Sequence, residues 1–152
     1  MFDEDLPPGL HNYWKSNDID ELSDGFIDTL LEHYAERPAG AMVVIDQFGG
    51  AVARVHDDAT AFGHRHAAYD LIIATLWPDP EQTEEHVEWA RGLWDAIQPY
   101  AEESVYVNYL GEEGDERVHA AYGEEKYARL AALKRKYDPE NVLRGNQNIK
   151  PA

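Results

Sequence analysis

Residues 68–80 read AYDLIIATLWPDP, and this stretch decides the fold. Its first part carries the apolar residues 71–73 and predicts a strand. Its second part breaks the strand with prolines, where Asp79 is a good helix N-cap and Pro80 suits the first turn of a helix. The stretch therefore predicts a strand over 68–77 that is followed at once by a helix.

Three further strands are expected from short apolar runs. Residues 41–45 and 51–55 are two such runs, and the glycine pair at 49–50 favours a hairpin turn between them. Residues 104–110 are rich in aromatic and β-branched side chains and predict another strand. Together with the helical segments, this pattern predicts an α+β fold in which an antiparallel sheet of about four strands is covered by helices.

Helices are expected where apolar residues recur at helical spacing. A capping box at residues 18–21 predicts the start of the first helix, and residues 37–40 predict its end. The other expected helices lie at residues 80–98, 118–122 and 124–137. The chain is expected to form a single domain over 1–152, with an irregular lead-in at 1–17, sheet and helices at 18–110, and a C-terminal segment at 111–152.

The chain is strongly acidic, with 30 acidic and 13 basic residues and a formal net charge of −17. Such a surface repels phosphates, so neither nucleic acids nor anionic membranes are expected as partners. The acidic residues are spread over the whole chain. This distribution favours solubility in high salt, and a halophilic source, over a basic partner or a cation site.

Several absent sequence features narrow the function further. There is no cysteine, which excludes disulfides and thiolate catalysis. No apolar run approaches the roughly 20 residues that span a bilayer. The acidic residues 1–6 do not read as a signal peptide, so a soluble cytoplasmic protein is expected. The sequence contains neither a GxGxxG motif nor a P-loop for nucleotide phosphates.

Two histidines are candidates for a metal site. His64 and His66 are two positions apart, so on an extended strand both would point to the same side. Asp57 or Asp58 would then supply a carboxylate ligand. The spacing matches no recognised zinc motif, so a surface or packing role is favoured and no metal is expected.

Tyr106 and Asn108 are harder to explain as surface residues. On a strand they point to the same side, and a phenol beside an amide suits a ligand because both groups donate and accept hydrogen bonds. The alternative is a strand whose outward face happens to be polar. The polar tail at 144–151 is expected to be frayed, and it is a candidate for a functional role only if other residues hold it in place.

The same segments resemble a known family. The C-terminal pieces lie at residues 106–109, 122–123, 127–130, 133–139 and 146–149, and the upstream pieces at 49–52, 59–65 and 77–80. In this order they resemble the C-terminal, substrate-side region of berberine-bridge-like FAD-linked oxidases of the vanillyl-alcohol oxidase type. The resemblance implies a domain whose antiparallel sheet lies over the flavin ring.

The resemblance also implies roles for individual residues. Tyr106 matches the tyrosine of the family's YxN motif, which acts as a catalytic base or an orienting hydroxyl. The residues implied to lie near the cofactor are Asn108, Asn146 and Asn148. The residues implied to face the substrate are Asp70, Ile72 and either Asp46 or Gln47. Plant relatives often carry a longer polar side chain at the position of Ile72.

The function implied by the resemblance is oxidation of an alcohol, a sugar or an amine by hydride transfer to FAD. The phosphate loops of the flavin-binding half are not found in this sequence. The chain is therefore expected to act only with a separate FAD-binding polypeptide. The alternative is a non-catalytic remnant, or a stand-alone domain that forms a homodimer through its sheet face.

Overall fold

A three-stranded antiparallel sheet organises the computed structural model, which describes residues 7–63, 65–102, 105–111, 114–145 and 147–152. Its strands are β1 (His11–Ile19), β2 (Ala41–Gln47) and β3 (Tyr69–Trp77). The spatial order is β1-β3-β2, so the strand predicted from residues 68–77 is central and pairs with both neighbours.

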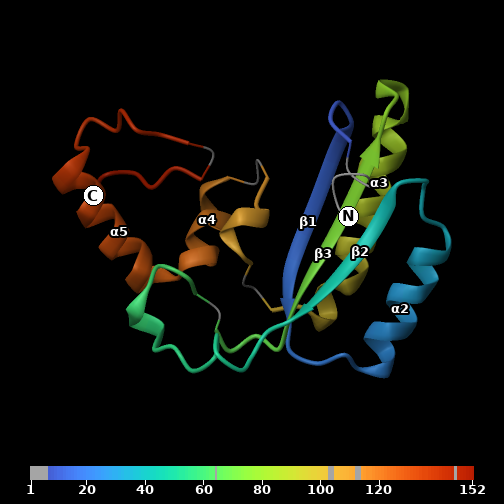
Figure 1. The fold of residues 1–152 in the computed structure, drawn as a ribbon, viewed down its shortest axis with the longest axis horizontal. Coiled ribbons are helices and arrows are strands. Elements are labelled where there is room, and N and C mark those ends of the chain that lie inside the picture. Colours follow the sequence, from blue (N-terminus) through green and yellow to red (C-terminus); the bar gives the residue numbers. More distant parts are fainter. Residues whose placement is uncertain (1–6, 64, 103–104, 112–113, 146) are drawn as a thin grey trace.

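Four α-helices lie around this sheet in the described part of the chain (Figure 1). Helices α2 (Asp24–Ala35) and α3 (Thr83–Ile97) pack beside it, whereas α4 (Asp115–Tyr122) and α5 (Glu124–Tyr137) form a separate group on the β1 side. The helices expected after Pro80, at 118–122 and at 124–137 are confirmed, and so is the α+β class.

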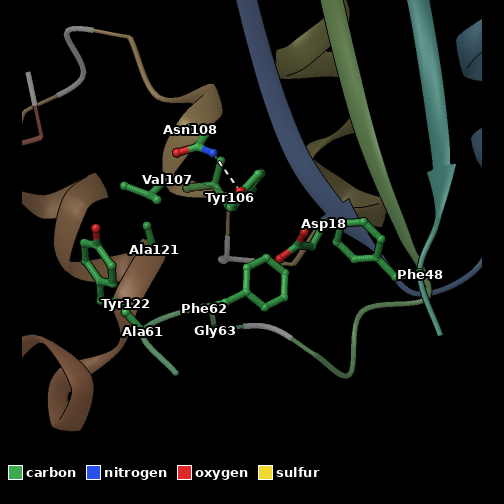
Figure 2. Close-up of a pocket in the computed structure, with 11 residues that line it drawn as sticks. Asp18, Phe48, Ala61, Phe62, Gly63, Tyr106, Val107, Asn108, Ala121 and Tyr122 are labelled. Atoms are coloured by element: carbon green, nitrogen blue, oxygen red, sulfur yellow. Dashed lines mark hydrogen bonds between the residues drawn. The ribbon is translucent and has the colours of Figure 1, made fainter. Parts of the chain in front are cut away.

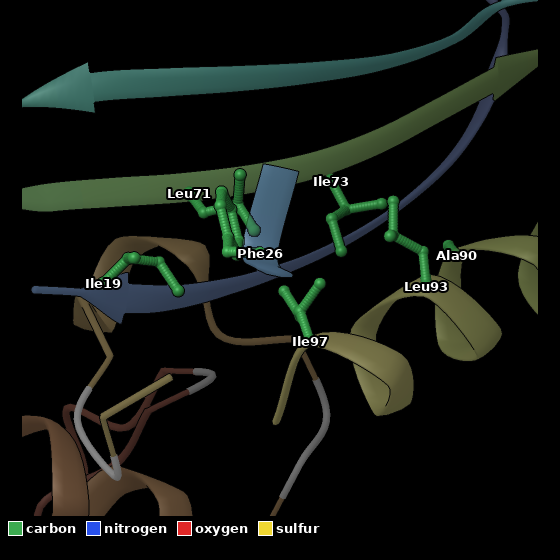
Figure 3. Close-up of a cluster of buried hydrophobic side chains, with 7 residues drawn as sticks. All are labelled: Ile19, Phe26, Leu71, Ile73, Ala90, Leu93 and Ile97. Atoms are coloured by element: carbon green, nitrogen blue, oxygen red, sulfur yellow. The ribbon is translucent and has the colours of Figure 1, made fainter. Parts of the chain in front are cut away.

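The main hydrophobic core lies between the sheet and the helices α2 and α3. Because side chains alternate along a strand, Leu71 and Ile73 of β3 point to the same face and meet the buried stripe of α3. The cluster is completely shielded from solvent and consists of Ile19, Phe26, Leu71, Ile73, Ala90, Leu93 and Ile97 (Figure 3). The opposite face of the sheet, called the open face below, carries no helix of this layer.

The irregular lead-in expected at 1–17 is wrong from residue 11 onward. Residues 11–19 form β1 and pair with β3 along their whole length, from His11↔Trp77 to Ile19↔Tyr69. The capping box expected at 18–21 is wrong for the same reason. The first helix begins instead after Ser23, whose Oγ accepts a hydrogen bond from the Phe26 backbone N–H at 3.3 Å.

Two expected strands do not form, so the described sheet has three strands and not four. Gly49 and Gly50 have φ angles of 133° and 51°, and they begin a series of turns over 50–55 in place of a hairpin. The Arg65 guanidinium donates a hydrogen bond to the carbonyl oxygen of Val52 at 3.2 Å, which ties this loop to the segment before β3. Residues 107–109 form a short 3-10 helix, η4 (Val107–Tyr109), where the fourth strand was expected.

Candidate functional site

A cavity of about 200 Å³ lies between the end of the sheet that carries Asp18 and the C-terminal segment (Figure 2). Asp18 at the end of β1 and Phe48 after β2 form one side of it, and Tyr106 and Tyr122 form another. Most of the remaining lining is apolar. We call this space the aromatic cavity, because three chain segments that are distant in sequence bring their rings to it.

The rings beside the cavity contact one another in series. Phe48 meets Phe62 with ring centroids 6.2 Å apart, and Phe62 meets Tyr106 at 5.3 Å. Tyr106 in turn meets Tyr109 at 5.3 Å. All three contacts are edge-to-face, the geometry that aromatic pairs prefer. This packing fixes the position of the Tyr106 ring at the cavity wall.

Tyr106 and Asn108 contact each other, although they do not lie on a strand. The Asn108 Nδ2 atom donates a hydrogen bond to the Tyr106 hydroxyl oxygen at 2.6 Å. Asn108 belongs to η4, and the turn brings the two side chains together where an extended strand was expected to do so. Because the phenol accepts this bond, its own proton is left to donate to a ligand.

Three aspartates lie side by side on the open face of the sheet. The strand register pairs Asp18 with Asp70 and Asp70 with Asp46, so one carboxylate from each strand stands in the same row. Directly opposed residues have Cβ atoms about 4.5–5.5 Å apart, which makes neighbouring like charges unfavourable. We call these three residues the acidic row. It borders the aromatic cavity at Asp18.

Asp70 is the central and most unusual member of the acidic row. Its side chain is 1% exposed, and neither carboxylate oxygen has a hydrogen-bond partner within the described part of the chain. Burial, followed by the charges of Asp18 and Asp46, raises the pKa of Asp70 to about 7. A carboxyl group with this pKa accepts and releases a proton at neutral pH.

Tyr109 faces the acidic row and was not singled out by the sequence patterns. Its burial, followed by the charges of Asp70 and Asp46, raises the pKa of its hydroxyl. In a 3-10 turn, positions three apart lie on the same side, so Tyr106 and Tyr109 would have been grouped had the turn been expected. Phe48 and Phe62 were also missed, because isolated aromatic residues in loops carry no periodic signal.

The other residues predicted to face the substrate divide between the two faces of the sheet. Ile72 lies on the open face, one row from Asp70, and pairs with Ser16 and Val44. Gln47 alternates with Asp46 and so points to the helix-covered side, where it is exposed. The structure therefore brings Asp46, and not Gln47, beside Asp70.

The C-terminal tail is anchored close to the cavity. The Gln147 Nε2 atom donates to the carbonyl oxygen of Leu110 at 2.6 Å, just after η4. Ile149 packs on the second hydrophobic cluster, which consists of Val105, Leu110, Val118 and Ala121. Asn148 is half-buried between these two contacts, whereas Asn146 lies outside the described residues.

Of the two histidines considered for a metal site, only His66 lies among the described residues. His66 Nε2 lies 3.2 Å from a carboxylate oxygen of Asp57, and this contact lowers the pKa of Asp57. His64 lies outside the described residues. Among the residues described, no group of three histidine, aspartate or glutamate side chains is placed to hold a metal ion, and no helix is long and apolar enough to cross a bilayer.

The sheet, its helix layer and the C-terminal segment have the fold of one part of a solved enzyme structure. The structure of berberine bridge enzyme from Eschscholzia californica matches 97% of this chain with a TM-score of 0.86, at 21% sequence identity, and the match covers 34% of that protein. The family model described as berberine and berberine like matches residues 105–150.

Two curated relatives extend the match to nearly the whole chain. An FAD-linked oxidoreductase of Dictyostelium discoideum is 30% identical over 99% of this chain and 33% of its own length. Berberine bridge enzyme-like C-1 of Nicotiana tabacum is 31% identical over 84% of this chain and 28% of its own length. The chain belongs to the berberine-bridge-like family of FAD-linked oxidoreductases, and it spans about a third of the length of these relatives.

The residues of the site fit one part of FAD and not another. The aromatic wall and the Tyr106–Asn108 pair suit a planar ring with polar edges, because aromatic faces stack and the amide group both donates and accepts. A pyrophosphate needs backbone N–H groups or cations. The acidic row beside the cavity would repel it, so the described residues fit the ring end of the cofactor and not its pyrophosphate.

Proposed function

We propose that this chain forms the substrate side of an FAD-dependent oxidoreductase and works with an FAD-binding polypeptide. The observation that carries the proposal is Asp70, a buried carboxyl group that lacks a hydrogen-bond partner in the described structure and pairs across the strands with Asp18, which lines the aromatic cavity. A stable fold leaves few such groups without a role, and perturbed carboxyl groups near cavities are concentrated at functional sites.

Asp70 is the proposed proton acceptor of the reaction. Oxidation of an alcohol or an amine removes a proton from oxygen or nitrogen while a hydride leaves carbon, and FAD when bound takes the hydride. The pKa of Asp70 is about 7, so at neutral pH a substantial fraction of the molecules carries the ionised carboxylate that can accept a proton. Tyr109, which faces the same row, donates a hydrogen bond to the ligand or to Asp70.

The proposed cofactor contacts come from the C-terminal segment. Tyr106 orients the ligand through the hydroxyl proton left free by its bond from Asn108. Asn108 and Asn148 bind polar atoms at the edge of the flavin ring, and Asn146 is proposed for the same edge. The anchoring of Gln147 on Leu110 supports this placement, since it keeps the tail beside η4.

Reconstitution tests this function. The chain would be co-expressed with the FAD-binding part of the Dictyostelium discoideum relative, and anaerobic bleaching of the flavin by candidate alcohols, sugars and amines would be recorded. We expect bleaching with the complex, and a loss of about 10²–10⁴-fold in rate for Asp70→Asn, the range for a general base. Asp28→Asn on the exposed face of α2 is the matched control.

The partner requirement has its own test. Titration of the purified chain with FAD is expected to show no stoichiometric submicromolar binding, because the acidic row beside the aromatic cavity would repel the pyrophosphate. Tight one-to-one binding by the chain alone would show that the partner is not needed for cofactor binding. Equal bleaching rates for Asp70→Asn and Asp28→Asn would show that Asp70 is not the proton acceptor.

A second candidate function is self-association through the open face. Trp14 and Val44 lie on this face and are 41% and 38% exposed. Exposed apolar side chains of this kind favour binding of another protein surface. Sedimentation at low and high salt tests this candidate. A dimer that Trp14→Lys dissociates would support it, and a monomer at every concentration would rule it out.

A further inference from the structure

Another cavity, of about 170 Å³, lies between residues 60–61 and one face of α5. Among the described residues, Ala61 is the one that lines both this cavity and the aromatic cavity, so the two are distinct spaces. We call this space the α5 pocket, and the proposed oxidoreductase role does not use it. Its lining residues are Thr60, Ala61, Lys126, Arg129, Leu130 and Leu133.

Helical spacing brings the α5 side chains to this pocket together. They stand at positions i, i+3, i+4 and i+7, which share one face of a helix: Lys126, Arg129, Leu130 and Leu133. A stripe with this spacing usually carries apolar residues that pack against the rest of the protein. Here two of its members are cations, and Leu133 is 50% exposed. This face of α5 therefore combines positive charge with uncovered apolar surface.

The two cations of the pocket keep hydrogen-bond donors for a ligand. Arg129 Nη1 donates to the backbone carbonyl oxygen of Asp58 at 3.3 Å, and the other donors of this guanidinium have no partner in the described part of the chain. Lys126 donates no hydrogen bond to a described residue. Its charge acts on Asp57, but that carboxylate already lies 3.2 Å from His66 Nε2. A ligand that accepts hydrogen bonds and carries negative charge would satisfy both cations.

Thr60 adds a hydroxyl donor to the pocket. Its Oγ1 atom accepts hydrogen bonds from Arg65 Nη2 at 2.6 Å and from the Phe62 backbone N–H at 3.3 Å. These bonds use both lone pairs of the oxygen, so the hydroxyl proton is left to donate. Arg65 is 6% exposed, and a buried guanidinium strengthens the donor to which it is bonded. The polar groups of the pocket are thus donors, whereas most of the chain is acidic.

The surroundings favour an anion with one charge and an apolar tail. The formal net charge of the chain is −17, so a dianion such as phosphate is repelled about twice as strongly as a carboxylate. A guanidinium binds a carboxylate through parallel N–H donors. The apolar lining, which includes Leu130 and Leu133, offers nothing to the remaining oxygens of a phosphate but suits a hydrocarbon chain.

We propose that the α5 pocket binds a short amphipathic carboxylate. The carboxylate lies between Lys126 and Arg129, and the apolar tail lies against Leu130 and Leu133. The contacts are non-covalent, and the ligand leaves the aromatic cavity open.

Four small probes titrated into the purified chain test this proposal. Hexanoate, hexanol and hexylammonium share one tail and differ in charge, whereas acetate is the bare carboxylate that an acidic side chain of another protein would also present. Amide ¹⁵N NMR reports the affinities and the place of binding. We expect hexanoate to bind about tenfold or more tightly than hexanol or acetate, with shifts at residues 58–61 and 126–133. Hexylammonium is expected to leave these resonances unchanged.

Variants on α5 separate a built site from general attraction by its basic residues. Arg129→Gln and Lys126→Gln are each expected to weaken hexanoate binding about tenfold. Arg135→Gln removes the same charge from an exposed position of α5 that does not border the pocket, and it should leave the affinity within about twofold. Leu133→Ala shortens the apolar wall, so it should weaken hexanoate and leave acetate unchanged.

Four outcomes would overturn the carboxylate proposal. They are equal affinity for hexanoate and hexanol, equal affinity for hexanoate and acetate, equal losses for Arg129→Gln and Arg135→Gln, and hexanoate shifts that never saturate. Each variant is exposed or half-buried, and its amide spectrum without ligand shows directly that it is folded.

Discussion

The two halves of the molecule bury very different amounts of apolar side chain. The core under the sheet joins seven residues, among them Phe26, Ile73 and Leu93, and all seven are completely buried. The second cluster, in the C-terminal half, has four members with smaller side chains, such as Val118 and Ala121, and they are 1–8% exposed. Burial of each large apolar side chain contributes about 1.5–3 kcal/mol, so most of the stability lies under the sheet.

The C-terminal half depends more on polar contacts. Gln147 binds the carbonyl oxygen of Leu110, Lys150 pairs with Asp115, and Lys134 pairs with Asp138 at 2.5 Å. The first two contacts tie the C-terminal tail to residues 110 and 115, and all three supply little free energy. The comparison teaches that the Tyr106–Asn108 pair belongs to the less stable half, while the acidic row is fixed by the more stable one.

The largest expected effect comes from the main core. Phe26→Ala removes a fully buried ring and is expected to lower the free energy of unfolding by about 3–5 kcal/mol. Val118→Ala, in the second cluster, is expected to cost about 2 kcal/mol or less, because it removes only two methyl groups. Urea unfolding followed by circular dichroism measures both changes.

Equal losses in these two variants would contradict the comparison. In that case the two halves would form one cooperative unit with evenly spread stability. Hydrogen exchange adds the second readout: Val118→Ala should speed exchange in α4 and η4 and leave β3 protected, whereas Phe26→Ala should speed exchange throughout.

The next effect concerns Asp70, at the junction of the two halves. The unfolded chain loses this proton near the ordinary pKa of 3.8, whereas the folded chain keeps it up to about pH 7. Between these values the folded state binds more protons, so the contribution of Asp70 to stability falls as pH rises. Asp70→Asn removes the charge and keeps the shape. It is expected to stabilise the protein by about 2–4 kcal/mol at about pH 8 and to change little near pH 4.

Unfolding midpoints at the two pH values measure this effect, with Asp28→Asn as the control for net charge. A loss of stability at high pH in Asp70→Asn would show that the ionised carboxylate is satisfied in the fold. A gain would show that the site keeps a group that costs stability, as functional sites commonly do.

The elements that local rules define were predicted from the sequence. The central strand β3 and the helix α3 follow from an apolar run, two prolines and a regular apolar stripe, and nothing distant is needed to specify them. Strand β1 was missed because its residues, HNYWKSNDI, are largely polar. The polar side chains on its inward face find hydrogen-bond partners in α3. With the Asn17 amide oriented to match these partners, the Asn17 side-chain oxygen accepts a hydrogen bond from the Trp94 indole N–H at 2.9 Å.

The site was only partly predictable for a similar reason. The proximity of Tyr106 and Asn108 was predicted, although a 3-10 turn and not a strand brings the two side chains together. The resemblance named Asp70, and Asp46 as an alternative to Gln47, but the alignment of these two residues with Asp18 was not predicted, because they come from three strands and only the register aligns them. Register is set by non-local packing, and a shift of one residue would send each carboxylate to the other face.

The smallest expected effect tests the anchor of the tail. Gln147→Ala removes the hydrogen bond to the Leu110 carbonyl oxygen, and a bond of this kind contributes about 1 kcal/mol. The change is local, so we expect faster hydrogen exchange at 105–111 and 147–152 with an unchanged unfolding midpoint for the main core. Gln82→Ala is the matched control, because Gln82 is exposed and makes no side-chain capping bond. Unchanged exchange at 105–111 would show that Ile149 and its apolar neighbours hold the tail without Gln147, and the polar account of the C-terminal half would then be wrong.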